Sequence, residues 1–251
     1  MRIEKMIKDL DKEYYSEHPN SLDPTYSKFA LPGAVALLSD PQREHVLPFP
    51  IGRMETSARF KLDEKRCWRY MGREKFAELL SELQLVHSKH IYDKLWVYGT
   101  RGYGKSHLIA AMVCYLAALG KRVIYISDCR SCVGDPIEHL QTAMLFAWTD
   151  KATQKKILTL DTEDKIKEFL EEQEDVLYVF DQTNEVSEAK TANNEKKARL
   201  ADLIEILTSN GKAVLSSPAN YQEYLNRQMT QTNDRTMWVY GGFTPVCLNI
   251  G

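Results

Sequence analysis

The chain has 251 residues, of which 43% are hydrophobic and 27% charged, and its formal net charge is −2. This size and composition are those of a soluble globular protein with ample core, and the balanced charge creates no global field for nucleic acid or anionic lipid. The five cysteines are odd in number and scattered, which argues against a secreted disulfide framework and for an intracellular protein. The longest apolar run, residues 108–119, is too short to span a bilayer, so we expect no membrane partner.

The N-terminal part of the chain is rich in proline, with six prolines between positions 19 and 50. Because proline interrupts helices, we expect only short helical pieces here, one of them around residues 33–40. The segment contains too many apolar residues to be purely disordered. We interpret residues 1–66 as an N-terminal arm that packs on a main domain formed by residues 67–251.

From Trp68 onward, apolar residues recur alternately with helical and with strand-like spacing. The predicted helices cover residues 73–88, 105–120, 136–150, 162–174 and 200–211. The predicted strands cover residues 94–99, 121–128, 175–181, 212–220 and 236–244. Strands that alternate with helices in this way predict an α/β fold with a doubly wound, mainly parallel five-stranded sheet.

A glycine-rich loop lies between the first of these strands and the helix that follows it. The loop matches the pattern G-x-x-x-x-G-K-[ST] in full, and its residues are Gly99, Thr100, Arg101, Gly102, Tyr103, Gly104, Lys105 and Ser106, with His107 next. Glycines let backbone N–H groups converge on a phosphate, and the helix N-terminus adds its dipole. Lys105 is expected to reach the terminal phosphates of ATP, and the Ser106 hydroxyl to ligate Mg²⁺. The alternative is a plain glycine turn, which the flanking strand and helix disfavour.

The strand 175–181 ends in an acidic residue, Asp181. An aspartate at this place in phosphate-binding-loop enzymes holds Mg²⁺, so Ser106 and Asp181 are the predicted metal ligands, unless Asp181 merely caps the strand. In ATPases with an extra strand between the loop strand and the acidic strand, a glutamate usually follows and polarises the attacking water. This chain has Gln182 there, which can orient a water without deprotonating it, and Glu185 is the nearest carboxylate. Both stay candidates for this role, and slow turnover is expected.

The end of the fourth predicted strand carries the polar residues Ser216, Ser217 and Asn220. Their place predicts a contact with the γ-phosphate or the attacking water, and Ser217 and Asn220 are the two candidates for it. The alternative is an ordinary turn, because Pro218 and Asn220 are typical turn residues.

A second short motif precedes the loop strand. Residues 71–74 read Met-Gly-Arg-Glu and open an amphipathic helix. They resemble the hydrophobic-Gly-Arg-Glu box of AAA+ and STAND ATPases, in which this segment folds over the adenine. The separation between Gly72 and Gly99 suits that arrangement, which predicts nucleotide contacts for Gly72 and Arg73. The alternative is a helix N-terminus with an acidic first turn.

Taken together, five segments resemble the NTPase module of Crinkler-type effectors and of the related retrotransposon hot-spot proteins; they are residues 95–130, 135–148, 179–186, 215–220 and 239–244. The resemblance covers roughly residues 45–245 and implies an AAA+/STAND-like P-loop ATPase. It also implies action near DNA and a location in the nucleus or cytoplasm of a target host cell. Family members often carry a nuclease-like domain after this module, and since the chain ends at Gly251 we expect no DNA cleavage.

The residues and the resemblance lead to one main functional hypothesis and two alternatives. We expect a Mg²⁺-dependent ATPase that couples turnover to a conformational or assembly change. The first alternative is an interaction switch that binds ATP and barely hydrolyses it, and the second, weaker one is a small-molecule kinase. DNA and a second copy of the chain are open as partners. Arg227 or Arg235 would then reach a phosphate, in the same or a neighbouring subunit, although solvated surface arginines are the simpler interpretation.

Overall fold

The computed structural model describes residues 2–19, 31–51, 59–89, 94–187, 195–209, 211–218 and 234–240, with the backbone alone at residues 87–89, 185 and 187. Its central sheet has five parallel strands, which are β3 (Lys94–Gly99), β4 (Arg122–Ile126), β5 (Val176–Phe180), β6 (Lys212–Pro218) and β7 (Arg235–Val239). Their spatial order is β4-β5-β6-β3-β7, so β6 separates the loop strand β3 from the acidic strand β5. The prediction of a parallel five-stranded α/β sheet is confirmed.

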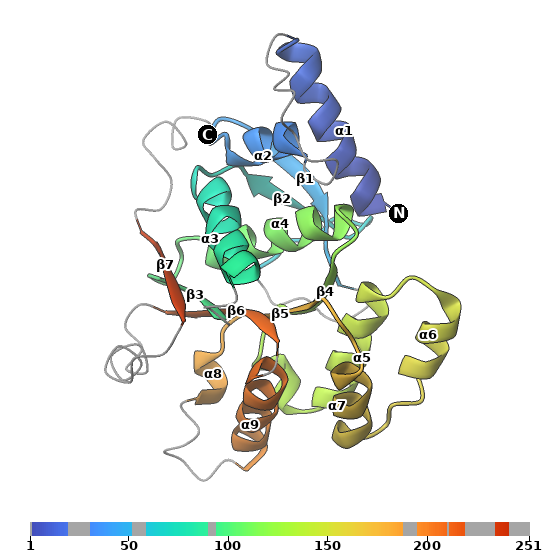
Figure 1. Ribbon diagram of the computed structural model, residues 1–251. Coiled ribbons are helices and arrows are strands. Elements are labelled where there is room, and N and C mark those ends of the chain that lie inside the picture. Colours follow the sequence, from blue (N-terminus) through green and yellow to red (C-terminus); the bar gives the residue numbers. More distant parts are fainter. Residues whose placement is uncertain are drawn as a thin grey trace.

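Helices cover both faces of this sheet (Figure 1). One face carries α3 (Lys75–Lys89) and α4 (Lys105–Ala118). The other face carries α5 (Pro136–Ala147), α6 (Lys151–Ile157), α7 (Glu163–Glu171), α8 (Asn184–Ser187) and α9 (Glu195–Ser209), with a 3₁₀ turn at Ser131–Val133. Within the described ranges, no helix combines the length and the apolarity needed to cross a membrane.

Alternation along the strands explains why the fold has two separate cores. Leu95 and Val97 of β3 belong to the core beneath α3 and α4, whereas Trp96 and Tyr98 belong to the core beneath α5, α7 and α9. Successive strand residues point to opposite faces, so a nearly continuous apolar run fills both cores. Because helices cover both faces of the sheet, a ligand would bind at its carboxyl edge, where the strands end.

The N-terminal part is more regular than the prolines suggested. It contains α1 (Arg2–Glu17), α2 (Pro32–Ser39) and β1 (Glu44–Pro48), which pairs in antiparallel fashion with β2 (Cys67–Met71). The expectation of short helical pieces alone is wrong, because the 16-residue α1 ends before the first proline and Pro32 begins a helix instead of breaking one. Helix α1 packs on α2 and α4. The division into an arm and a domain at residue 66 stays a prediction, and the β1–β2 pair spans it.

A buried histidine in this N-terminal sheet gives a pH prediction. The Nε2 of His45 lies 2.9 Å from the carbonyl oxygen of Leu37, and burial lowers the pKa of His45 although that carbonyl opposes the shift. The unfolded chain takes up a proton at about pH 6.5 while folded His45 stays neutral, so its stabilising contribution is complete above that pH and declines as the pH falls.

Urea unfolding measured between about pH 7.5 and pH 5.5 tests this dependence. We expect the wild type to lose more unfolding free energy on acidification than His45→Gln, which keeps a donor for Leu37 but does not titrate. Parallel pH profiles of the two proteins would contradict the prediction.

Candidate functional site

The predicted phosphate loop joins β3 to α4 and ends in a glycine that starts the helix. Gly104 is the N-cap of α4 in the left-handed conformation, with φ 74° and ψ 24°, and Gly102 also has positive φ. Because Gly104 has no side chain to cap the helix, the first-turn N–H groups of α4 remain available to an anion. The loop and helix therefore form the cradle that a phosphate requires.

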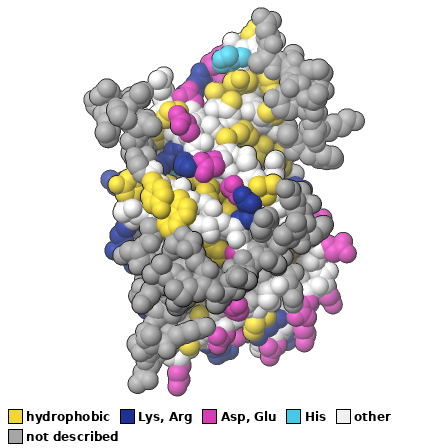
Figure 2. All heavy atoms as spheres, turned by 60° about the vertical axis from the view of Figure 1, so that its left-hand side comes forward, with side chains coloured by type: hydrophobic (Ala, Val, Ile, Leu, Met, Phe, Trp, Pro, Cys, Tyr) yellow, Lys and Arg dark blue, Asp and Glu magenta, His cyan; other side chains and the backbone are white. Residues whose placement is uncertain are grey.

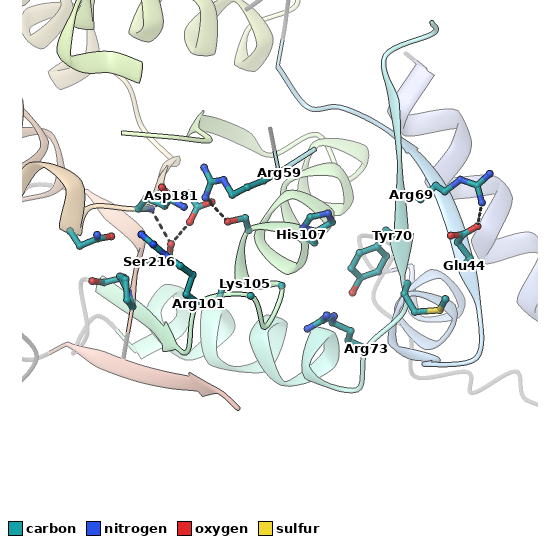
Figure 3. A pocket seen from close by; sticks show the side chains of 18 residues that line it. Glu44, Arg59, Arg69, Tyr70, Arg73, Arg101, Lys105, His107, Asp181 and Ser216 are labelled. Atoms are coloured by element: carbon teal, nitrogen blue, oxygen red, sulfur yellow. Dashed lines mark hydrogen bonds and ion pairs between the residues drawn. The ribbon is translucent and has the colours of Figure 1, made fainter. Parts of the chain in front are cut away.

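A cavity of about 530 Å³ lies at this loop (Figure 3). Its lining includes many of the predicted site residues, namely Met71, Arg73, Arg101, Gly102, Gly104, Lys105, Ser106, His107, Asp181, Gln182, Ser216 and Ser217. The predicted residues Gly72, Gly99, Thr100 and Tyr103 are adjacent to lining residues and do not line it themselves. The structure thus brings the loop, the acidic strand end and the upstream box around one space.

Lys105 lies over its own loop. Its Nζ donates to the carbonyl oxygens of Gly99 and Thr100, at 2.5 and 3.1 Å. Burial lowers the pKa of Lys105, while Asp181 raises it and the cations of Arg59 and Arg101 lower it further. A partly desolvated ammonium group at a phosphate cradle has a stronger attraction for an anion than one in water.

Asp181 follows β5 directly and is almost completely buried. Its Oδ1 accepts a hydrogen bond from the Ser216 hydroxyl, and its Oδ2 lies 3.5 Å from Nη1 of Arg59. Burial raises the pKa of Asp181, against the opposing effects of the Arg59 cation and of the nearby Ser106 and Ser216 hydroxyls. A hydroxyl and a carboxylate together form the hard oxygen set that Mg²⁺ accepts alongside water and phosphate oxygens. Ser106 and Asp181 therefore fit a shared magnesium ion.

Several buried polar atoms of cavity-lining residues have no hydrogen-bond partner within the described part of the chain. Two of them are Oε1 of Gln182 and Oγ of Ser217. Gln182 has φ +64°, an uncommon backbone conformation for glutamine, and its N–H donates to Ser216 Oγ at 3.1 Å. Buried polar atoms normally have partners, so both atoms are suited to a bound phosphate or water.

Four other predicted residues lie away from the cavity or outside what the structure describes. Glu185 lies on α8 with only its backbone described, and Asn220 and Arg227 are outside the described residues. Arg235 begins β7, at the amino end of the sheet and away from the loop, where its Nε donates to the Glu82 carboxylate. Arg235 therefore cannot contact a phosphate held by the loop of its own chain.

The upstream box lies beside the phosphate loop. Nη1 of Arg73 donates to the Tyr103 carbonyl oxygen at 2.5 Å, and Met71 and Arg73 line the cavity. The Gly72 N–H donates to the Arg43 carbonyl oxygen at 2.9 Å, which fixes the box to the N-terminal segment.

The close approach at Gly72 gives a stability prediction. A Cβ built there would lie 2.1 Å from the carbonyl oxygen of Asp40, a backbone atom that cannot move alone. We expect Gly72→Ala to lower the unfolding free energy by about 1–3 kcal/mol in urea denaturation. Gly134→Ala is the matched control, because nothing lies within 4 Å of its added methyl group and its φ is −73°. Equal stability of the two variants would argue against the steric explanation.

Sequence motifs gave no indication of one residue at the centre of the site, Arg59. Its Nη1 donates to Ser106 Oγ at 3.0 Å and its Nη2 to the Ser127 carbonyl oxygen at 3.1 Å. Arg59 belongs to no motif and reaches the loop across 47 positions of sequence, so only the folded structure shows the contact. The contacts of the His107 ring with Phe60 and Trp68 were also not predicted. Burial, together with the nearby cations, lowers the pKa of His107 to about 4.

The sheet order and the cradle at the start of α4 define a P-loop NTPase fold. A family model described as novel STAND NTPase 1 matches residues 58–238. The chain belongs to this novel STAND NTPase family.

Comparison with solved structures finds distant neighbours. The Walker-type ATPase of Pyrococcus abyssi is 17% identical with a TM-score of 0.42, over 76% of this chain and 57% of that one. The DUF1998 helicase MrfA bound to DNA is 14% identical with a TM-score of 0.34, over 88% of this chain and 35% of that one. This chain thus spans little more than half of the ATPase and about a third of the helicase. No curated protein matches the chain.

Proposed function

We propose that the protein is a Mg²⁺-dependent nucleoside triphosphatase that prefers ATP. The observation that supports this most directly is that Lys105, Ser106 and Asp181 line one cavity at the carboxyl edge of the sheet. A lysine ammonium group can bind phosphate oxygens, and a serine hydroxyl and an aspartate carboxylate can bind Mg²⁺. The three residues therefore suit the parts of a metal–triphosphate complex.

The residues at the cavity have separate proposed roles. The backbone N–H groups of the loop and the Lys105 ammonium group bind the phosphates and stabilise the charge that develops on them. Ser106 and Asp181 would hold Mg²⁺, which neutralises phosphate charge when bound. Ser216 fixes Asp181 through its hydroxyl and positions the carboxylate.

Gln182 is the proposed residue for the attacking water. Gln182 lines the cavity next to Asp181, and its Oε1 is buried without a hydrogen-bond partner in the described part of the chain. A carboxamide oxygen can accept a hydrogen bond from water without removing a proton. Glu185 stays the second candidate, and Ser217 or Asn220 the proposed contact to the γ-phosphate. Comparing Gln182→Ala with Glu185→Ala separates the first two, since the residue that handles water should cause the larger loss of turnover.

The proposed adenine site is the end of the cavity formed by Met71 and Arg73. Both residues line the space, and Arg73 reaches the phosphate loop through the Tyr103 carbonyl oxygen. The thioether of Met71 can contact a base face, and the guanidinium group of Arg73 can stack on it. Gly72 contributes through the backbone geometry that places these two neighbours.

A second candidate function is an interaction switch that binds ATP and turns it over very slowly. The observation that favours it is Gln182, an amide where a carboxylate would act as a base. Incubation of the purified chain with Mg²⁺-ATP distinguishes the two. Steady release of ADP over many turnovers supports the triphosphatase, and bound ATP that persists without ADP supports the switch. Absence of ATP binding would contradict both.

For the biological role of this activity, we follow what the resemblance to Crinkler-type effector modules implies. In that role ATP turnover drives a conformational or assembly change in the nucleus or cytoplasm of a host cell, with DNA or a second copy as partner. On the face seen in Figure 2, basic and acidic side chains are interspersed over the described surface, so charge on that face does not favour DNA. Duplex DNA in the ATPase assay tests the DNA partner, and concentration dependence of the rate per molecule tests self-assembly.

A further inference from the structure

Arg59 contacts both proposed metal ligands, and Figure 3 shows its guanidinium group beside Asp181. One nitrogen, Nη1, lies 3.0 Å from Ser106 Oγ and 3.5 Å from Asp181 Oδ2. The other, Nη2, lies 3.1 Å from both the Ser127 carbonyl oxygen and Asp128 Oδ2. The guanidinium group thus has one nitrogen on the metal ligands and the other on the end of β4.

The backbone next to Arg59 is fixed against the phosphate helix. Phe60 is 3% exposed, and its ring stacks on that of His107 with centroids 4.8 Å apart. The same ring contacts Trp68 edge-on, at 5.3 Å. These ring contacts of Phe60 hold the backbone beside Arg59 in place. The Arg59 side chain can therefore change its orientation while its backbone stays at the site.

The positive charge of this guanidinium group opposes the binding of a second cation at the same oxygens. Asp181 is 1% exposed, and such a carboxylate needs a cation beside it. A divalent ion on Ser106 and Asp181 would lie within a few ångströms of Nη1, and two cations that close repel strongly at low dielectric. The Arg59 guanidinium group and the divalent ion therefore compete for the Ser106 and Asp181 oxygens. A triphosphate brings negative charge that favours the ion.

We propose that Arg59 and Mg²⁺ exchange at the Ser106–Asp181 pair, and that the displaced Nη1 then donates to the terminal phosphate. Nη2 stays on Asp128 and Ser127 throughout, so the movement is a rotation of the guanidinium group about an anchored end. Free Mg²⁺ competes poorly with Arg59, whereas Mg²⁺ that enters with a triphosphate is accepted. Arg59 is thereby a positioning residue for the metal ligands and a recognition residue for the third phosphate. This inference depends on the proposed function for the identity of the ligand.

Thermal unfolding without nucleotide tests the exchange. Arg59→Gln leaves Asp181 without its cation, so we expect its Tm in chelator to fall by about 5 °C or more, and Mg²⁺ to restore about half of that loss. Mg²⁺ should shift the wild-type Tm by only about 1 °C, because Arg59 already holds the site. Arg130→Gln is the matched control, since Arg130 pairs with Asp128 at 3.2 Å and is not one of the residues that line the cavity. The same response to Mg²⁺ in all three proteins would overturn the exchange.

Arg59→Lys provides the test if Arg59→Gln does not fold. A lysine keeps the charge but its single amine cannot hold both ends of the site, so Mg²⁺ should stabilise this variant more than the wild type. Equal stabilisation would overturn the exchange.

Affinity for nucleotides tests the second part of the proposal. Loss of a charge-assisted hydrogen bond to the third phosphate should reduce the preference for a non-hydrolysable triphosphate over ADP by about tenfold in Arg59→Lys or Arg59→Gln. An unchanged preference would overturn the phosphate contact. Failure of the proposed function is a different result, because Lys105→Ala would then bind triphosphate as the wild type does.

Discussion

Lys105→Ala should release ADP at a rate about 10²- to 10³-fold below that of the wild type. The expected loss follows from the position of the side chain, whose ammonium group lies over the loop at the N-terminus of α4 and lines the cavity. Alanine removes the charge that offsets developing phosphate charge, and leaves the loop glycines and the buried helix α4 intact. The measurement is steady-state ADP release with saturating Mg²⁺-ATP.

The control for this variant is Lys121→Ala. Lys121 is an exposed lysine between α4 and β4, outside the cavity lining, so its loss should leave the rate unchanged. Circular dichroism and urea unfolding establish that Lys105→Ala is folded. Turnover at the wild-type rate in folded Lys105→Ala would remove the assignment of the loop as the phosphate site.

Asp181→Asn is expected to reduce turnover at least about 100-fold without unfolding the protein. Asparagine keeps an acceptor for the Ser216 hydroxyl but is a much weaker ligand for a divalent cation. Two effects on stability oppose one another, because the ion pair with Arg59 is lost and a buried charge is removed. We therefore expect the unfolding free energy to change by about 1 kcal/mol or less.

Magnesium titration of the rate provides the specific readout for Asp181. Any residual activity of Asp181→Asn should need a higher Mg²⁺ concentration, and a surface variant such as Asp161→Asn should keep the wild-type dependence. The exposed Asp161 pairs with Lys165 and is not one of the residues that line the cavity, so its replacement matches the change in charge. An Asp181→Asn protein with wild-type rate and wild-type Mg²⁺ dependence would contradict the metal role.

The parts of the fold that were predictable are those encoded by local patterns. The run 94–99 and the glycine loop determine β3 and the start of α4, and the apolar run before Asp181 determines β5. Since the carboxyl ends of parallel strands share one edge, the convergence of Lys105 and Asp181 followed from the predicted sheet. The loop pattern is specific because its residue types, its spacing and its flanking elements are all required together.

The unpredicted parts depend on contacts between distant segments. Arg59 reaches Asp181 across the site, and β1 pairs with β2 although residues 49–66 separate the two strands in sequence. The number of prolines was also a poor guide to helix length in the N-terminal part. A helix needs only an interval free of proline, and α1 lies in such an interval. The left-handed backbone of Gln182 is likewise set by its bond to Ser216 on a neighbouring strand and not by its own preference.

The two cores divide the tryptophans in a way that suits spectroscopy. Of the four tryptophans in the chain, Trp96, Trp148 and Trp238 pack with the core beneath α5, α7 and α9. Trp68 lies in the other core with its ring 5.2 Å from that of His107, one residue after the proposed metal ligand Ser106. Replacing the first three with phenylalanine would leave a single intrinsic fluorophore against the phosphate helix, whose emission reports nucleotide and metal binding without an added label.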